Sequence, residues 1–178
     1  MVHDSSVTHY YTKSGDKGDT GVVGQRLRKT DARITAIGDV DETNAALGVA
    51  LAHCEDVAVR SLLLKAQNTL FTVGAELAGT AQVAVKPEHV DDLEKGILFF
   101  ADKLAPQTTF LLPNGTKSAS FLHLARAVCR RAERSVVALQ EQKLVNAELV
   151  RYLNRLSSLL YVLARYENRN GNEQAPVY

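Results

Sequence analysis

The apolar residues of the chain recur at helical spacing from residue 39 onward, and no segment keeps the alternation of apolar and polar positions that marks a β-strand. This pattern predicts an all-α protein with helices over residues 39–53, 57–77, 87–104, 117–140 and 147–166. Because the connections between them are short, consecutive helices should run antiparallel. We therefore expect a five-helix up-and-down bundle with an extended glycine-rich N-terminal segment.

Residues typical of helix ends support these boundaries. Asp39 can cap the first helix, with Glu42 at the reciprocal position of a capping box. Gly79 is a natural stop for the second helix, and Pro87 suits the first turn of the third. Pro106 closes the third helix because proline cannot continue it.

The chain of 178 residues is predicted to form one domain, with an N-terminal segment over 1–38, a helical bundle over 39–166 and a polar tail over 167–178. The tail is expected to be mobile. A structureless stretch of 38 residues is unusual in a compact domain unless it has a function. The N-terminal segment is therefore the first place to search for a binding site.

Charge and composition exclude several classes of protein. With 21 basic and 20 acidic residues, no global field marks a nucleic-acid or membrane-surface binder. The sequence has neither a signal peptide nor the run of about 18 apolar residues that a membrane span needs, so a cytoplasmic protein is expected. Cys54 and Cys129 lie far apart without a CxxC spacing, which indicates reduced packing residues. The histidines show no metal-ligand spacing and are interpreted as non-catalytic: His3, His9, His53, His89 and His123.

The N-terminal segment is rich in glycine, with one at every third position from Gly15 to Gly24. Such a loop can bring backbone N–H groups close to an anion, because glycine tolerates positive φ and has no Cβ to obstruct the approach. Lys13 and Lys17 add ammonium groups, and neighbouring threonine and serine residues add hydroxyl donors. The pattern is neither a P-loop nor GxGxxG. Phosphate binding and a solvated, flexible arm both remain open.

The fourth predicted helix concentrates arginine on one face. Arg126, Arg130 and Arg134 share a stripe with a single carboxylate, that of Glu133. Like charges four residues apart repel, so a bound anion or a facing acid would explain the arrangement, and an ordinary basic solvent face is the alternative. Asp41 is a candidate counter-ion for one of the arginines, or it simply stabilises the start of the first helix.

The fifth predicted helix places Asn154 beside a leucine stripe. A buried amide there would need hydrogen-bond partners, which a ligand or a neighbouring helix could supply.

Taken together, three segments resemble the ATP:cob(I)alamin (corrinoid) adenosyltransferases of the five-helix, trimeric type, over about residues 10–166. The first is the glycine-rich run 11–21 with its continuation at 29–33 and 38–44. The second is 126–134 and the third is 152–157. The co-occurrence of all three in this order makes the resemblance specific.

The resemblance implies a homotrimer whose active sites lie between subunits, with the N-terminal segment of one subunit folding over ATP against the fourth and fifth helices of a neighbour. Magnesium is expected to be held mainly by the ATP phosphates. Asp41 and Arg126 match a salt bridge between subunits that borders the corrinoid, and Phe110 matches an aromatic residue beneath the corrin ring. The implied catalytic residues are Arg130, Asp41, Arg126 and Phe110. The implied ATP-binding residues are Thr12, Lys13, Ser14, Gly15, Lys17, Gly18, Thr20, Gly21, Lys29, Arg130, Arg131, Ala132, Glu133, Arg134 and Asn154.

The resemblance also implies the reaction, transfer of the 5′-deoxyadenosyl group of ATP to Co(I) of a reduced corrinoid to give adenosylcobalamin and triphosphate. A reductase that supplies the electron and an adenosylcobalamin-dependent mutase are the protein partners it suggests. The alternative is a carrier that binds ATP or corrinoid and delivers adenosylcobalamin without making it. A purely structural helical bundle is a third hypothesis, which leaves the glycine-rich segment and the arginine face unexplained.

Overall fold

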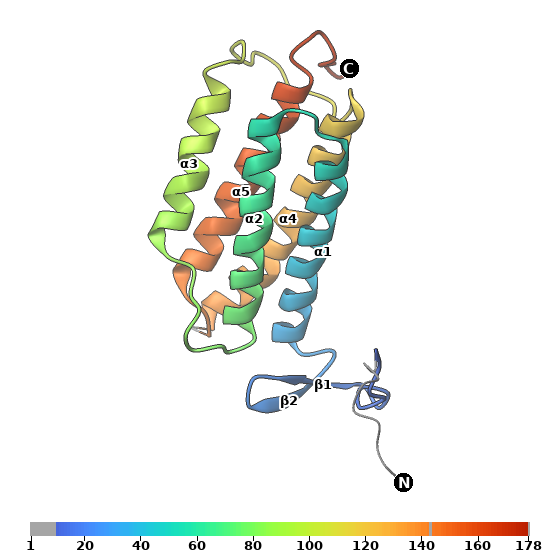
Figure 1. The fold of residues 1–178 in the computed structure, drawn as a ribbon, viewed down its shortest axis with the longest axis vertical. Coiled ribbons are helices and arrows are strands. Elements are labelled where there is room, and N and C mark those ends of the chain that lie inside the picture. Colours follow the sequence, from blue (N-terminus) through green and yellow to red (C-terminus); the bar gives the residue numbers. More distant parts are fainter. Residues whose placement is uncertain (1–9, 143, 178) are drawn as a thin grey trace.

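A computed structural model describes residues 10–142 and 144–177, in which five helices lie side by side and consecutive helices alternate in direction (Figure 1). His3 and His9 lie outside the described residues. The helices are α1 (Ala32–His53), α2 (Val57–Leu77), α3 (Pro87–Ala101), α4 (Lys117–Glu141) and α5 (Ala147–Glu167). The predicted up-and-down five-helix bundle is confirmed.

Most predicted helix boundaries agree with the structure to within one residue. α2 spans the predicted range, and α4 and α5 each extend one residue further. Gly79, at φ 93°, follows the end of α2 as expected. α3 ends at Ala101 rather than near Leu104, because the N–H groups of Lys103 and Leu104 bond three residues back and tighten the chain into a turn.

The predicted start of the first helix is wrong by seven residues, since α1 begins at Ala32 and not at Asp39. The cap is Asp31, whose Oδ1 accepts a hydrogen bond from the backbone N–H of Arg33 at 2.8 Å. Ala36 and Val40 are both buried and continue the inward face toward the start of the helix. The bundle therefore includes residues 32–38, which the sequence pattern assigned to the N-terminal segment.

A small antiparallel hairpin, which the sequence pattern did not predict, precedes α1 and is added to the predicted helical bundle. β1 (Asp19–Val22) pairs with β2 (Gln25–Arg28), with Gly24 at φ 75° in the turn. Two strands of four residues are too short to show a period-two pattern. The hairpin lies beyond one end of the bundle (Figure 1), and the N–H of Val23 donates to the carbonyl of Ala78 at 3.2 Å.

The core is built mainly from leucine, valine and alanine on the inward faces of the helices, with Tyr152 and Phe100 as its largest fully buried members. Both cysteines belong to this core as unpaired thiols. Burial raises the pKa of Cys54 to about 12, and the same cause raises that of Cys129 to about 12. The prediction of two reduced packing cysteines is confirmed.

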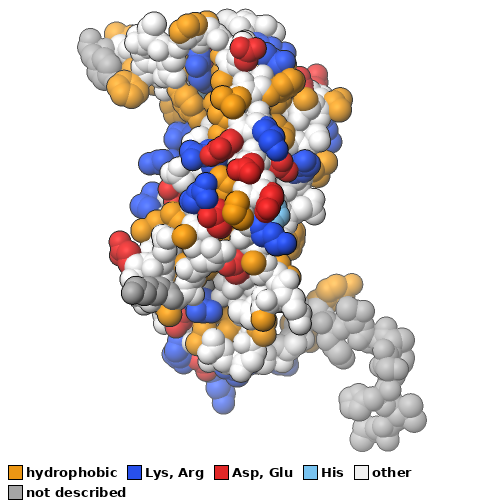
Figure 2. Space-filling view, turned by 90° about the vertical axis from the view of Figure 1, so that its left-hand side faces the viewer, with side chains coloured by type: hydrophobic (Ala, Val, Ile, Leu, Met, Phe, Trp, Pro, Cys, Tyr) orange, Lys and Arg blue, Asp and Glu red, His pale blue; other side chains and the backbone are white. Residues whose placement is uncertain are grey.

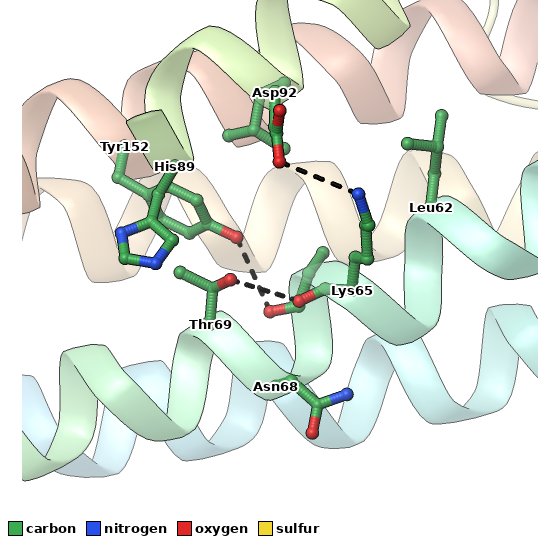
Figure 3. A pocket seen from close by; sticks show the side chains of 9 residues that line it. Leu62, Lys65, Asn68, Thr69, His89, Asp92 and Tyr152 are labelled. Carbon is green, nitrogen blue, oxygen red and sulfur yellow. Dashed lines mark hydrogen bonds and ion pairs between the residues drawn. The ribbon is translucent and has the colours of Figure 1, made fainter. Parts of the chain in front are cut away.

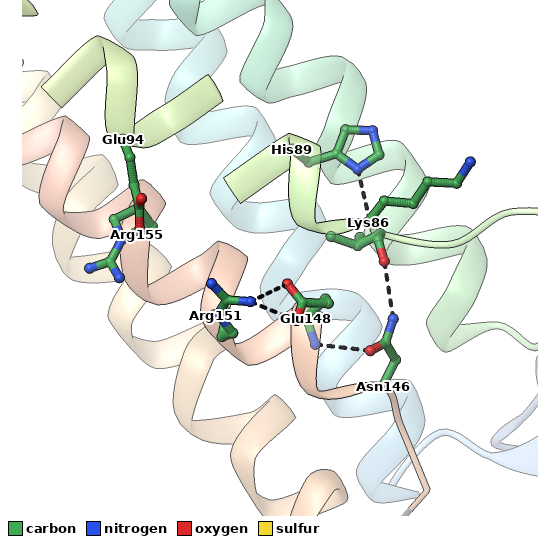
Figure 4. Close-up of polar contacts among 8 residues, drawn as sticks. Lys86, His89, Glu94, Asn146, Glu148, Arg151 and Arg155 are labelled. Carbon is green, nitrogen blue, oxygen red and sulfur yellow. Dashed lines mark hydrogen bonds and ion pairs between the residues drawn. The ribbon is translucent and has the colours of Figure 1, made fainter. Parts of the chain in front are cut away.

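Polar contacts fasten α3 and its preceding loop to α5 (Figure 4). Arg155 Nε donates to Glu94 Oε1 at 2.8 Å, and the amide of Asn146 donates to the carbonyl of Val85 at 3.1 Å. On the α3 side of the molecule, acidic and basic side chains are intermingled (Figure 2), as in the neighbouring ion pairs of Asp92 with Lys65 and Lys95. This face therefore has no extended patch of one charge.

The tail after α5, which we expected to be mobile, makes specific contacts at the end of the bundle opposite the hairpin (Figure 1). The carbonyl of Gln174 accepts from the N–H of Leu112 at 2.8 Å, and Glu173 pairs with Arg165. The tail thereby holds the loop between α3 and α4. Among the described residues, no helix combines the length and the apolar character needed to cross a membrane.

Candidate active site

A pocket of about 290 Å³ opens between the outer faces of α4 and α5. Two of the predicted arginines, Arg126 and Arg130, line it from α4, and Tyr161 lines it from α5. The remaining lining residues are Ser157, Ser158 and Val162. Arg130 is solvent-exposed, so its guanidinium is accessible to an anion that enters the pocket.

Glu133 and Asn154 join the two helices one turn further along the same face. The amide nitrogen of Asn154 donates to Glu133 Oε1 at 2.8 Å. Asn154 is exposed, so the expectation of a buried amide is wrong, because its side chain points away from the leucine stripe toward α4. Arg134 donates to the carbonyl of Arg130, one turn earlier in α4, at 3.0 Å.

Arg131 differs from its neighbours because acids of the same chain already neutralise it. Its guanidinium pairs with Asp39, at 3.3 Å from Nε to Oδ1, and with Glu42. The hydrogen bond that Arg131 donates to Glu42, together with the negative charge of that carboxylate, raises the pKa of Arg131. Asp39 also accepts from the hydroxyl of Ser135 at 2.5 Å. Asp39 and Glu42 therefore fasten α1 to α4 and are not the capping box that the sequence suggested.

Two further predicted residues occupy different environments. Ala132 is completely buried in the core, so its side chain offers no surface to a ligand. Asp41 is exposed on α1, at a groove of about 510 Å³ between α1 and α2 that also includes Phe71. Because α1 begins at Ala32, Asp41 lies well inside the helix, and the alternative that it stabilises the helix start is wrong.

Arg126 and His123 each have a buried nitrogen atom whose hydrogen-bonding capacity is unused. The Nε of Arg126 and the Nδ1 of His123 are both buried without a hydrogen-bond partner among the described residues. Burial lowers the pKa of His123, and the positive charge of Arg126 lowers it further. The guanidinium carbon of Arg126 lies 6.0 Å from the ring centroid of Tyr161. Arg126 is thus half-buried with spare donor capacity.

Phe110 lies in the loop between α3 and α4, with 79% of its surface exposed. Side chains of α5 hold this loop against the bundle. The hydroxyl of Tyr161 donates to Gln107 Oε1 at 2.7 Å, and Arg165 donates to the carbonyl of Ala105 at 3.0 Å. The exposed aromatic ring therefore stands at the same end of the α4–α5 face as Tyr161.

The glycine-rich segment forms tight turns around the base of the hairpin. Gly18 has φ 85°, and Lys13 adopts φ 60°, which is uncommon for a residue with a Cβ. The N–H of Lys29 donates to the carbonyl of Gly18 at 2.9 Å. A Cβ on Gly15 would meet Lys29 Nζ at 3.2 Å, so the ammonium group lies directly against the glycine turn. The hydroxyls of Thr12 and Ser14 are within 2.7 Å of each other.

The single chain brings together only part of the predicted site. Within residues 10–142 and 144–177, no hydrogen bond or ion pair joins the glycine-rich segment to α4 or α5, and none joins Asp41 to Arg126. The segment extends beyond the end of the bundle, beside the hairpin (Figure 1). The donors of the segment and the arginines of α4 are therefore two separate surfaces of one chain.

A second pocket, of about 240 Å³, contains none of the predicted site residues. It lies between α2 and α3 (Figure 3), where Lys65 Nζ is 3.6 Å from Asp92 Oδ2 and Tyr152 closes the inner wall. Across the described part of the chain, no three His, Cys, Asp or Glu side chains are grouped so that they could bind a metal ion.

Sequence reasoning missed Tyr161 and Gln107, which connect the pocket to the Phe110 loop. The signal for Tyr161 was present, because it follows Asn154 by seven residues and so lies on the same face of α5. Gln107 has no such signal, since it lies in a loop without periodicity.

The family profile described as cobalamin adenosyltransferase matches residues 10–167. A cobalamin adenosyltransferase from Cupriavidus metallidurans is 42% identical over 164 residues, covering 90% of this chain and 88% of the relative. A corrinoid adenosyltransferase from Mycobacterium leprae is 41% identical over 181 residues, covering 94% of each chain.

Solved structures of a relative have the same fold. An arginine-to-lysine variant of the PduO-type ATP:corrinoid adenosyltransferase from Lactobacillus reuteri, complexed with ATP, superimposes with a TM-score of 0.85 at 34% identity, covering 94% of this chain and 99% of that one. A phenylalanine-to-alanine variant from the same organism, complexed with cobalamin and ATP, gives a TM-score of 0.84 at 33% identity, covering 94% and 98%. With three matching segments, a shared five-helix bundle and relatives matched over nearly their whole length, the chain belongs to the cobalamin adenosyltransferase family, as a PduO-type ATP:corrinoid adenosyltransferase.

Proposed function

We propose that this corrinoid adenosyltransferase moves the 5′-deoxyadenosyl group of ATP onto Co(I) of a reduced corrinoid at a site that two subunits of a homotrimer build together. The observation that carries the proposal is the layout of the α4–α5 face. Arg130 lines a pocket at its centre, and Tyr161 links that pocket to the loop that presents Phe110. A nucleotide and a corrinoid bound side by side would occupy these two regions.

The glycine-rich segment supplies the other half of the ATP site, from a neighbouring subunit. It extends away from its own α4 and α5, so its ammonium and backbone donors are free to reach a second chain (Figure 1). Lys13, Lys17 and Lys29 provide positive charge, and the turns at Gly15 and Gly18 allow backbone N–H groups to approach phosphate oxygens. The hydroxyls of Thr12, Ser14 and Thr20 add hydrogen-bond donors. Gly21 has no side chain and can contribute only its backbone N–H.

The reaction forms one bond and breaks one bond. The electron pair of Co(I) forms the cobalt–carbon bond at C5′, and the C5′–O bond breaks with its electrons remaining on the triphosphate. No proton has to move, so the residues of this site need not include a general base. They have to align cobalt with C5′ and stabilise the charge that grows on the triphosphate. Arg130 is the residue best placed to stabilise the charge on the triphosphate. It is exposed in the pocket, and none of the described residues forms an ion pair with it.

Magnesium fits this site only as a partner of the nucleotide. Since the described residues group no three metal-ligating side chains, the ATP phosphates would provide its main ligands. When bound there, Mg²⁺ neutralises part of the triphosphate charge. The arginines and lysines of the two subunits neutralise the remainder.

Phe110 prepares the corrinoid. Its ring is exposed and held on a loop tied to α5, so it can lie beneath a corrin ring and exclude the lower axial ligand and water. A four-coordinate Co(II) is easier to reduce, because no axial ligand raises the energy of the orbital that accepts the electron. The corrinoid then supplies the nucleophile, and the protein sets its coordination.

An anaerobic assay tests the function directly. Chemically reduced cobalamin, Mg²⁺ and ATP are mixed with the protein, the light-sensitive alkylcobalamin spectrum is followed, and the phosphate product is identified. Adenosylcobalamin formed together with triphosphate supports the proposal. Nucleotide binding without either product would instead indicate a carrier. Sedimentation at several protein concentrations tests the trimer.

A further inference from the structure

The loop that carries Phe110 has no helix or strand of its own, so its shape depends on a few hydrogen bonds. One side chain makes two of them. Gln107 Oε1 accepts from the hydroxyl of Tyr161 at 2.7 Å, and Gln107 Nε2 donates to the carbonyl of Thr109 at 2.8 Å. A single amide thus connects α5 to the peptide group that directly precedes Phe110.

Tyr161 faces the nucleotide side of the site as well. It lines the pocket together with Arg126 and Arg130, and the Arg126 guanidinium carbon lies 6.0 Å from its ring centroid. The hydroxyl that reaches Gln107 therefore belongs to a residue that borders the proposed triphosphate region. Through these two hydrogen bonds, the backbone at Phe110 is fixed relative to the arginine pocket.

We propose that Gln107 is a positioning residue that holds Phe110 in place for lower-ligand displacement and links the Phe110 loop, through Tyr161, to the nucleotide pocket. The inference rests on the role of Phe110 in the proposed function. Because the Phe110 ring is 79% exposed, packing against its own chain does little to fix it, and hydrogen bonds of the loop backbone must do so instead. The Gln107 amide bonds to the carbonyl of Thr109, the residue directly before Phe110, and ties that carbonyl to Tyr161.

Replacing the amide tests this role. Gln107→Ala removes both hydrogen bonds, and the fraction of ATP-dependent four-coordinate cob(II)alamin should fall by about three- to tenfold, as expected for the loss of one or two hydrogen bonds. The dissociation constant for ATP should stay within about twofold, because the amide lies outside the triphosphate region. Thr108→Ala is the matched control, since Thr108 is exposed in the same loop and should leave both measurements unchanged. An unchanged four-coordinate fraction in Gln107→Ala overturns the proposal.

A double-mutant cycle separates the link to Tyr161 from a general effect on the loop. Tyr161→Phe removes the hydroxyl alone and should reduce the four-coordinate fraction in the same direction. If the two residues act through their shared hydrogen bond, the double variant with Gln107→Ala should be no worse than the more affected single variant. If the fold-losses of the two single variants multiply in the double variant, Gln107 and Tyr161 act independently and the proposed link between them is wrong.

Phe110→Ala distinguishes failure of this inference from failure of the proposed function. If Phe110→Ala abolishes the four-coordinate signal while Gln107→Ala preserves it, only the positioning role of Gln107 is wrong. If Phe110→Ala also preserves the signal, the role assigned to Phe110 is wrong, and with it the inference that depends on it.

Discussion

The side chain of Asn168 joins the end of α5 to the start of α4, because its Oδ1 accepts a hydrogen bond from the backbone N–H of Thr116 at 2.9 Å. Its amide nitrogen donates to the carbonyl of Asn114 at 2.7 Å. Asn168 is only 2% exposed, so water does not compete for these bonds. One side chain thus closes the loop between α3 and α4 at its C-terminal end.

Replacing Asn168 with Ala should lower the free energy of unfolding by about 1–3 kcal/mol, because the part-buried N–H of Thr116 and the carbonyl of Asn114 lose their partners. Urea denaturation measures the change. Asn170→Ala is the control, since Asn170 is exposed and its loss should cost less than about 0.5 kcal/mol. Equal denaturation midpoints for the two variants would show that the Asn168 bonds contribute nothing.

Arg130→Ala should lower kcat/KM for ATP by about 10²- to 10³-fold, because the group that stabilises the departing triphosphate is lost. Steady-state kinetics under anaerobic conditions measure this. Arg151→Ala removes another exposed arginine, whose partner is Glu148 and which does not line the pocket, and should change the rate by less than about twofold. Full activity in Arg130→Ala would contradict the assignment.

Asp41 and Arg126 are the proposed salt bridge between subunits. Within the described residues, Arg126 forms no ion pair and its Nε has no hydrogen-bond partner, while Asp41 is exposed on α1. Asp41→Arg and Arg126→Asp should each weaken corrinoid binding by about tenfold or more, and the charge-swapped double variant should recover much of the loss. Corrinoid titrations and sedimentation measure both steps. No recovery in the double variant would argue against a direct pair.

His123 gives the stability a predictable dependence on pH. Its pKa is lowered by burial and by Arg126, while Glu173 acts in the opposite direction and the Tyr161 ring lies 6.0 Å away. Since the folded pKa lies below the unfolded value of about 6.5, the folded state favours the neutral ring. The stability that the neutral ring of His123 contributes is fully present at pH values above the unfolded pKa. It is lost as the pH falls from the unfolded pKa toward the folded pKa.

Urea denaturation at pH 7.5 and pH 5.5 tests the effect of His123. The wild-type protein should lose more stability over this interval than His123→Gln, which keeps a polar side chain that does not titrate. A parallel loss in both proteins would assign the pH dependence to other groups.

The helical pattern predicted the bundle well, because leucine-rich stripes at 3.6-residue spacing directly record which faces are buried. It placed the start of α1 late because Asp39 and Glu42 have the spacing of a capping box. In the structure these carboxylates bind Arg131 on α4, a tertiary contact that local spacing does not reveal. The true cap, Asp31, lies in a polar stretch that looked like a loop.

The candidate site was predictable only in part, for a related reason. Arg126 and Arg130 share a helical face, so their common pocket follows from periodicity. Gln107 and Asn168 act through single hydrogen bonds between segments distant in sequence, and no local pattern marks such residues. Asp41 could not be assigned from the chain alone, because the described residues offer it no basic partner.

The burial of Cys54 and Cys129 limits the side reactions that this chain can undergo. A thiolate is both a strong ligand for cobalt and a nucleophile that could be alkylated, whereas a protonated thiol is neither. Because the pKa of each cysteine is raised to about 12, the sulfur atoms stay protonated at neutral pH, and both are shielded inside the bundle. Neither cysteine therefore offers a competing thiolate to a corrinoid at the α4–α5 face.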